Sequence, residues 1–87
     1  MKEQTEQLIH AFSRSPTEKI QIHARRYKGE LYVDLRIWFQ TRDNPVFRPT
    51  TKGITFRYDY LSELRQGLDR LAAMKDKLLE NEPIPSQ

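Results

Sequence analysis

Aromatic and basic side chains alternate along residues 19–40, at positions that would share one side of an extended chain. They are Lys19, Arg25, Tyr27, Tyr32, Arg36 and Trp38, with Lys28 beside them. Aromatic rings stack on nucleobases, contributing ~1–3 kcal/mol per base, and neighbouring cations bind phosphates. Because the faces of paired bases are covered in a duplex, this pattern favours binding of an unpaired nucleic-acid strand.

Two structural roles would produce the same pattern, and the sequence excludes neither. Aromatic residues favour strands wherever they lie, and Arg–Tyr pairs across strands stabilise a sheet on their own. Alternatively, the N-terminal segment or a second subunit covers this side of the sheet. A separate functional alternative is a protein-interaction module, whose aromatic face docks a peptide or another subunit.

Two strands and a tight turn are needed to bring these residues together. Period-two alternation predicts strands at Lys19–Tyr27 and Leu31–Gln40, joined by a two-residue Lys28-Gly29 turn that fixes the register. The outward pairs in that register are Arg25 with Tyr32, His23 with Asp34, Gln21 with Arg36, and Lys19 with Trp38. The inward pairs include Ile22 with Leu35 and Ala24 with Val33. Both strands therefore agree about which side is the core.

Asp34 is an acidic residue within this basic surface. Its expected neighbours are Arg36 and His23, so we expect it to orient Arg36 and to hold His23 rather than to bind a ligand. The register places no serine or cysteine nucleophile near His23 and no pair of carboxylates on one face. The sequence therefore predicts a binding protein and not an enzyme.

Further strand and helix patterns follow this hairpin. The segment "PVFRPTT" predicts an edge strand, because proline does not donate to a strand ladder, and "KGITFR" predicts a fourth strand. Leucines at three- and four-residue spacing then predict one long C-terminal helix from near Asp59 to about Leu79. The expected fold class is α+β, a four-stranded antiparallel sheet followed by this helix. Residues 1–18 are predicted to be a flexible segment, 19–80 the domain and 81–87 a tail.

The predicted helix carries two adjoining apolar strips, although one sheet needs only one of them. A core this small typically supplies only ~3–5 kcal/mol. The chain has no cysteine for disulfides and only 2 histidines, which excludes a Cys/His zinc cluster. We therefore expect a symmetric homodimer with neither metal nor cofactor. The residues expected at its interface are Leu64, Gly67, Leu71, Met74 and Leu78.

The charge distribution agrees with a polyanionic partner. Residues 14–57 contain ten Lys and Arg against four Asp and Glu, whereas the whole chain has a formal net charge of only +3. No apolar run approaches the ~18 residues of a membrane span, and the N-terminus lacks the apolar core of a signal peptide. We expect an intracellular protein with no membrane partner, in the cytoplasm or nucleoid if bacterial and in the nucleus if eukaryotic.

Three segments of the chain resemble a known family. The run "ARRYKGELYVDLRIWF", the segment "RPTTKGITF" and the leucine-rich helix together resemble the transcriptional coactivator family positive cofactor four, over about Lys19 to Leu71. The most specific parts are "YKG", "VDLRIW" and "KGIT", which have the order and spacing of the family. The resemblance implies a curved four-stranded sheet, dimerisation through the helices, and two antiparallel channels for single-stranded DNA.

The resemblance also implies roles for individual residues. The matching positions are Arg25, Tyr27 and Lys28 at the end of one strand, Arg36 and Trp38 in the next, and Arg48 and Lys52 around the proline loop. With Lys19 and Tyr32, these residues form the predicted nucleic-acid-binding set. Glu30 replaces a lysine of the coactivators, which should weaken phosphate binding at the turn. The stacking ring is Trp38 if the alternation holds and Phe39 if a bulge intervenes.

The sequence supports three functional hypotheses. The first is a dimer that binds single-stranded or melted DNA with little sequence preference, with a role in transcription regulation and with the transcription machinery as a partner. The second is the protein-interaction module described above. The third is an RNA-binding variant, which uses the same chemistry and which the sequence does not separate from the first. The long regulatory N-terminal region of the eukaryotic coactivators is missing, which favours a compact bacterial-type member.

Overall fold

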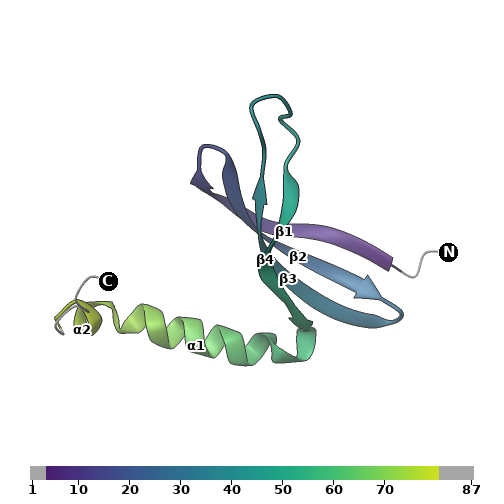
Figure 1. The fold of residues 1–87 in the computed structure, drawn as a ribbon. Coiled ribbons are helices and arrows are strands. Elements are labelled where there is room, and N and C mark those ends of the chain that lie inside the picture. The colour runs from purple at the N-terminus through teal and green to yellow at the C-terminus, as the bar shows by residue number, and fades with distance from the viewer. Residues whose placement is uncertain (1–3, 81–87) are drawn as a thin grey trace.

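A computed structural model describes residues 4–80 of the chain and has an α+β architecture. Four antiparallel strands lie in the order β1-β2-β3-β4 and twist strongly about their centre (Figure 1). The strands are β1 (Gln4–Ser15), β2 (Glu18–Tyr27), β3 (Glu30–Phe39) and β4 (Arg48–Arg57). A short 3-10 turn η1 (Tyr58–Tyr60) then leads into the helices α1 (Leu61–Ala73) and α2 (Lys75–Glu80). The predicted fold class, a four-stranded antiparallel sheet followed by a helical segment, is thereby confirmed.

The β2–β3 hairpin has the register that the sequence predicts. Tyr27 lies opposite Glu30, and every expected pair is present as far as Lys19 opposite Trp38. Lys28 and Gly29 both have positive φ angles, 51° and 81°. Positive φ at both central residues defines a type I′ turn, whose twist matches that of the flanking strands. Local turn chemistry and strand alternation therefore fix this part of the fold.

Strand β1 corrects the prediction that residues 1–18 form a flexible segment. Residues 4–15 pair with β2 along their whole length, so the sheet begins at Gln4 and not at Lys19. The register shifts between Leu8 and His10 and again between Ser13 and Ser15. These bulges break the alternation from which a strand is recognised, which explains why the sequence pattern hid β1. Residues 1–3 and the predicted tail at 81–87 lie outside the described residues.

Strand β4 replaces two predicted strands with one. Its proline lies in an edge strand, as predicted, but "PVFRPTT" and "KGITFR" do not form separate strands. Arg36 lies opposite Gly53 whereas Trp38 lies opposite Pro49, so β4 contains extra residues that bulge between these pairs. The hydroxyl of Thr50 donates a hydrogen bond of 2.7 Å to the carbonyl oxygen of Ile37. This contact holds the bulge against β3.

Gly53 is required by the close approach of β4 to β3. A Cβ atom at this position would lie 2.6 Å from the carbonyl oxygen of Leu35 and 2.7 Å from the Cα of Arg36. Such distances are far shorter than van der Waals contact. The absence of a side chain at Gly53 therefore allows β4 to pack closely against β3.

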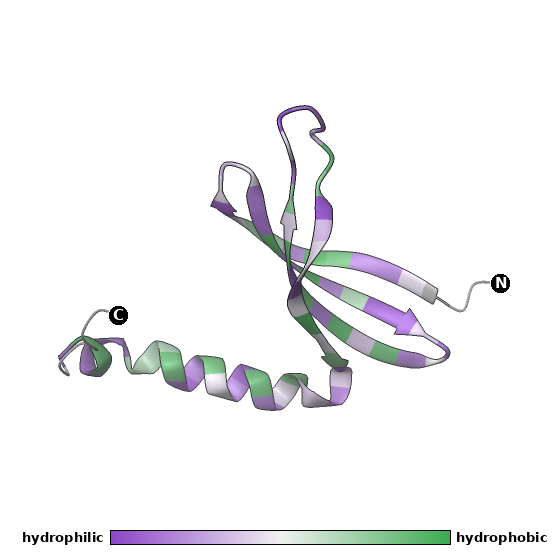
Figure 2. Ribbon diagram, in the orientation of Figure 1, coloured by the Kyte–Doolittle hydropathy of each residue, from purple (hydrophilic) through white to green (hydrophobic). Residues whose placement is uncertain are grey.

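The helical segment is interrupted, unlike the single long helix of the prediction. Met74 separates α1 from α2, with φ −98° and ψ 8°. Asp59 does not cap α1; the N-cap residue is Tyr60, which makes no side-chain capping bond. Helix α1 projects away from the sheet (Figure 1), and apolar and polar residues alternate in bands along its ribbon (Figure 2). Within residues 4–80, no helix is long and apolar enough to cross a membrane.

The core of this chain is thin. Within the described residues, Val33 is the one apolar side chain of the core that is buried, and it remains 7% exposed. An apolar groove of about 270 Å³ separates the inner side of the sheet from the first turns of α1. Its apolar lining includes Ile22, Val33, Leu35, Phe56, Leu61, Leu64 and Leu68. Leu68 and Leu71 are 54% and 55% exposed, so much of the helix's apolar surface has no cover within the described chain.

Candidate nucleic-acid interface

The predicted aromatic and basic residues of the hairpin share one face of the sheet, here called the outer face. Because side chains alternate along a strand and the β2–β3 register is unbroken, the odd-numbered residues of β2 and the even-numbered residues of β3 point the same way. The structure therefore brings together Lys19, Arg25, Tyr27, Tyr32, Arg36 and Trp38. The Nζ atom of Lys28 lies 5.3 Å from the ring centroid of Tyr27 and extends this face at the turn.

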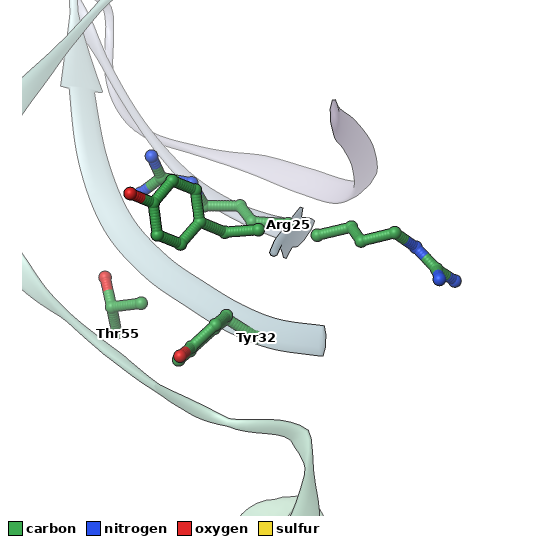
Figure 3. A pocket seen from close by; sticks show the side chains of 5 residues that line it. Arg25, Tyr32 and Thr55 are labelled. Atoms are coloured by element: carbon green, nitrogen blue, oxygen red, sulfur yellow. The ribbon is translucent and has the colours of Figure 1, made fainter. Parts of the chain in front are cut away.

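A pocket of about 290 Å³ opens at the turn end of the outer face (Figure 3). Its lining residues are Arg25, Arg26, Tyr27, Tyr32 and Thr55. Arg25 lies directly opposite Tyr32 across the hairpin, and Tyr27 remains 45% exposed. The site thus combines accessible aromatic rings with guanidinium groups, which is the chemistry needed to stack bases and bind phosphates.

Asp34 orients Arg36, as the sequence predicts. Asp34 is only 2% exposed, and its Oδ1 accepts hydrogen bonds from Arg36 Nη2 at 2.8 Å and from the Thr55 hydroxyl at 2.6 Å. Arg36 Nη1 also donates to the carbonyl oxygen of Thr50 at 3.0 Å. Arg36 is therefore bound on two sides within the sheet, and its charge is largely neutralised by Asp34.

Asp34 and Arg36 shift each other's pKa. Burial on its own would raise the pKa of Asp34, but hydrogen bonds from Arg36 and Thr55, together with the positive charges of Arg36 and Arg25, lower it below its ordinary value. The hydrogen bond to Asp34 in turn raises the pKa of Arg36. Both groups stay ionised, so this pair is a fixed element of the outer face.

His23 does not have the partner that the sequence suggested. Its Nε2 lies 2.7 Å from the side-chain oxygen of Gln21, and its Nδ1 lies 2.8 Å from a carboxylate oxygen of Glu6. Asp34 is opposite His23 in the register but directs its oxygens to Arg36 and Thr55. The acidic neighbour of His23 therefore comes from β1, which the sequence did not predict as a strand.

Trp38 lies on the expected face of the sheet, but one side of its ring is covered by another side chain. Its indole stacks on the imidazole of His23, and its Nε1 is buried without a hydrogen-bond partner among the described residues. The bulge that would have favoured Phe39 lies in β4 and leaves the β2–β3 register intact. Phe39 is opposite Glu18, on the other side of the sheet. Trp38 therefore lies on the outer face and Phe39 does not, and one side of the Trp38 ring is already covered by His23.

The two predicted cations of β4 are placed differently from each other. The register puts Arg48 beside Phe39, on the side of the sheet opposite to Trp38. Lys52 lies in the bulge, where its amide donates a hydrogen bond of 3.1 Å to the Thr50 hydroxyl, and it is exposed. Of these two residues, the structure places only Lys52 near the edge of the outer face.

The outer face contains two further residues that the predicted binding set does not include. Arg57 lies opposite Tyr32 and forms an ion pair of 3.2 Å with Glu30, which gives Glu30 a partner within the protein. The Nζ atom of Lys19 lies 4.6 Å from the ring centroid of Phe47, an aromatic residue of the β3–β4 connection. Phe47 therefore adds an aromatic ring beside Lys19. Its position directly before Arg48 in the sequence repeats the pairing of an aromatic with a basic residue, which could have indicated this role.

Glu6 is the residue of the outer face that depends most on the unexpected strand. Its carboxylate lies 3.7 Å from Arg25 Nε and 2.8 Å from His23 Nδ1. Strand β1 places Glu6 directly opposite Arg25. No sequence signal connected these residues, because the contact depends on the pairing of β1 with β2.

The twisted antiparallel sheet, its basic and aromatic outer face and the following helix define a class of small sheet-and-helix proteins. The model of the family described as Transcriptional Coactivator p15 (PC4) matches residues 15–67, and the chain belongs to this family. The matched region begins at the last residue of β1, so the rest of β1 precedes it. A search of curated proteins found no significant match.

Solved structures agree with this assignment. The chain is similar to a PC4 homolog from Burkholderia pseudomallei in an orthorhombic crystal form, at 35% identity and a TM-score of 0.70, with 78% of this chain and 90% of that chain covered. A tetragonal form gives 34% identity and the same TM-score, covering 78% and 98% of the two chains. A bacteriophage T5 homolog of PC4, at 18% identity and a TM-score of 0.58, shares the fold over 83% of this chain and 80% of that one.

Proposed function

We propose that the protein binds single-stranded or locally melted DNA through the outer face, with little sequence preference and with a role in transcription regulation. The observation that carries this proposal is the pocket at the turn end of the hairpin, where two tyrosines lie beside arginines on an exposed surface. Family membership supports it, because the solved relatives are described as homologs of a transcription coactivator. The proposed role is binding, without catalysis and without a cofactor.

The side chains of the outer face divide into two groups in this proposal. Tyr27 and Tyr32 stack on bases, while Arg25, Lys19 and Lys28 bind phosphates. Arg36 is already paired with the buried Asp34, so it shapes the face and contributes less to phosphate binding. Stacking and charge neutralisation are both insensitive to base identity, which accounts for the expected lack of sequence preference.

The proposal includes a dimer that covers the apolar surface of the helix. Its interface residues are Leu64, Gly67, Leu71, Met74 and Leu78, as the sequence suggests. An added Cβ on Gly67 would meet no atom within 4 Å, so the space beside this glycine is open to a second backbone. The thin core, the exposed leucines of the helices and the apolar groove beside α1 support a partner subunit, because exposed apolar patches mark protein–protein interfaces.

Competitive binding of oligo-dT, oligo-U and duplex DNA at two or more salt concentrations tests the proposal. If about four phosphates are bound per strand, the logarithm of the association constant should fall against the logarithm of salt with a slope near −3. Oligo-dT should compete far better than duplex. Equal or better competition by oligo-U would assign the site to RNA. A flat salt dependence, or no binding of any oligonucleotide, would reject the proposal.

A further inference from the structure

Strand β1 brings an acidic side chain against a cation of the outer face. Glu6 and Arg25 are opposite each other in the β1–β2 register, and Oε1 of Glu6 lies 3.7 Å from Nε of Arg25. The other carboxylate oxygen, Oε2, lies 2.8 Å from His23 Nδ1. One carboxylate therefore contacts two side chains that face the proposed binding surface.

We propose that Glu6 competes with a nucleic-acid phosphate for Arg25, and that this competition sets the affinity and the salt dependence of nucleic-acid binding. This inference rests on the proposed function. A carboxylate and a phosphate bind a guanidinium group through the same charge-assisted contacts, so the two anions compete for Arg25. A nucleic-acid phosphate must therefore displace Glu6 from Arg25 before it can bind there.

The Glu6–Arg25 pair is exposed enough for a phosphate to replace the carboxylate. The side chains of Arg25 and Glu6 are 37% and 38% exposed, and ion pairs at such positions are worth only ~0–1 kcal/mol. A phosphate can therefore replace the carboxylate at small cost. The contact with His23, whose side chain is only 9% exposed, keeps the carboxylate close to Arg25 after displacement.

The other acidic residues of the outer face do not form an exposed pair with a predicted phosphate-binding residue. Asp34 is buried and bound by Arg36 and Thr55, so its charge is fixed in place. Glu30 pairs with Arg57, which is also close to Asp59. Among the described ion pairs, Glu6–Arg25 is the exposed one that involves a predicted phosphate-binding residue.

Glu18 provides a matched control for Glu6. Its side chain is 37% exposed and lies 3.5 Å from Arg14, so it is also a half-exposed glutamate beside an arginine. Glu18 lies opposite Phe39, on the side of the sheet away from Arg25. Glu6→Gln and Glu18→Gln therefore change the net charge equally, but only Glu6→Gln frees a cation of the outer face.

The test measures binding of fluorescent oligo-dT to the full chain at several salt concentrations. Glu6→Gln should bind about two- to five-fold more tightly than wild type. Its salt slope should steepen by up to about 0.7, the value for one added phosphate contact on a single strand. Glu18→Gln should match wild type in both affinity and slope. In the Arg25→Gln background, Glu6→Gln should give no gain, because the guanidinium that it would free is gone.

Each contrary result has a defined meaning. If wild type binds and Glu6→Gln binds no more tightly, or if Glu18→Gln gains as much, the role of Glu6 is refuted while the proposed function stands. If Glu6→Gln still increases the affinity for oligo-dT in the Arg25→Gln background, the role of Glu6 is also refuted. If wild type does not bind oligo-dT at low salt, both proposals fail. Circular dichroism of each variant verifies that the sheet is intact.

Discussion

The indole of Trp38 lies parallel to the imidazole of His23, with ring centroids 4.8 Å apart and an interplanar angle of 4°. Trp38 is thus held in place by the protein before any ligand binds. Tyr27, at the other end of the outer face, is 45% exposed and so has part of its ring open to a ligand. The two rings should therefore respond differently to substitution.

Replacing Tyr27 by alanine should weaken oligo-dT binding by ~1–3 kcal/mol, because the exposed ring is free to stack on a base. The salt slope should stay nearly unchanged, since no charge is lost. Fluorescence anisotropy measures both quantities. Tyr27→Phe keeps the ring and should bind nearly as wild type does. Unchanged affinity in Tyr27→Ala would remove this residue from the site.

Replacing Trp38 by alanine should lower the free energy of unfolding by roughly 1–3 kcal/mol, less than for a fully buried aromatic residue because the ring is only half-buried. The loss comes from the stacking on His23 and from the space left behind. Urea denaturation measures it, and Trp38→Phe should recover part of the stability. A variant that loses affinity with no loss of stability would show that Trp38 acts on the ligand alone.

Asp34 should make the stability of the sheet sensitive to acid. Its pKa in the folded protein lies below the ordinary 3.8, so its contribution to stability is present above that value and is lost as pH falls through the folded pKa. Asp34→Asn should lower the free energy of unfolding at pH 7 by ~1–3 kcal/mol, because a buried hydrogen-bonded charge is removed from Arg36.

The comparison that isolates Asp34 is urea denaturation at pH 7 and at pH 3. Wild type should lose more stability between these two values than Asp34→Asn does. Asp43→Asn, in the exposed β3–β4 connection, should behave as wild type does. An equal acid-induced loss in wild type and Asp34→Asn would contradict the assigned role of the Asp34–Arg36 pair.

Gly53→Ala should destabilise the sheet by ~1–3 kcal/mol or more, because the new methyl group overlaps the backbone of Leu35 and Arg36. Backbone atoms cannot move aside as a flexible side chain can. Thermal unfolding monitored by circular dichroism measures the loss, with Thr51→Ala in the neighbouring exposed position as control. Wild-type stability in Gly53→Ala would mean that β4 lies farther from β3 than described.

Leu71→Glu should dissociate the proposed dimer, because it places a charge in the apolar strip of α1. Sedimentation velocity should show a wild-type dimer and a variant monomer at the same micromolar concentration. Gln66→Glu adds the same charge at another position of α1 and should leave the dimer intact. A monomeric wild type, or a dimeric Leu71→Glu, would contradict the proposed interface.

The hairpin and its outer face were determined by local sequence. Alternation in two consecutive segments and a two-residue turn are sufficient to fix the β2–β3 register, because each constraint acts between residues close in the chain. The orientation of Arg36 by Asp34 was predictable for the same reason, since residues two apart on a strand point to the same side.

Strand β1, the bulge of β4 and the partners of His23 were decided only by the tertiary structure. Strand β1 has an irregular pattern and is held by backbone hydrogen bonds to β2, which depend on proximity and not on side-chain type. Glu6 reaches Arg25 and His23 because this pairing carries it across the sheet. A contact between residues so far apart in the chain leaves no periodic signal, so the charge balance of the outer face became visible only once β1 was in place.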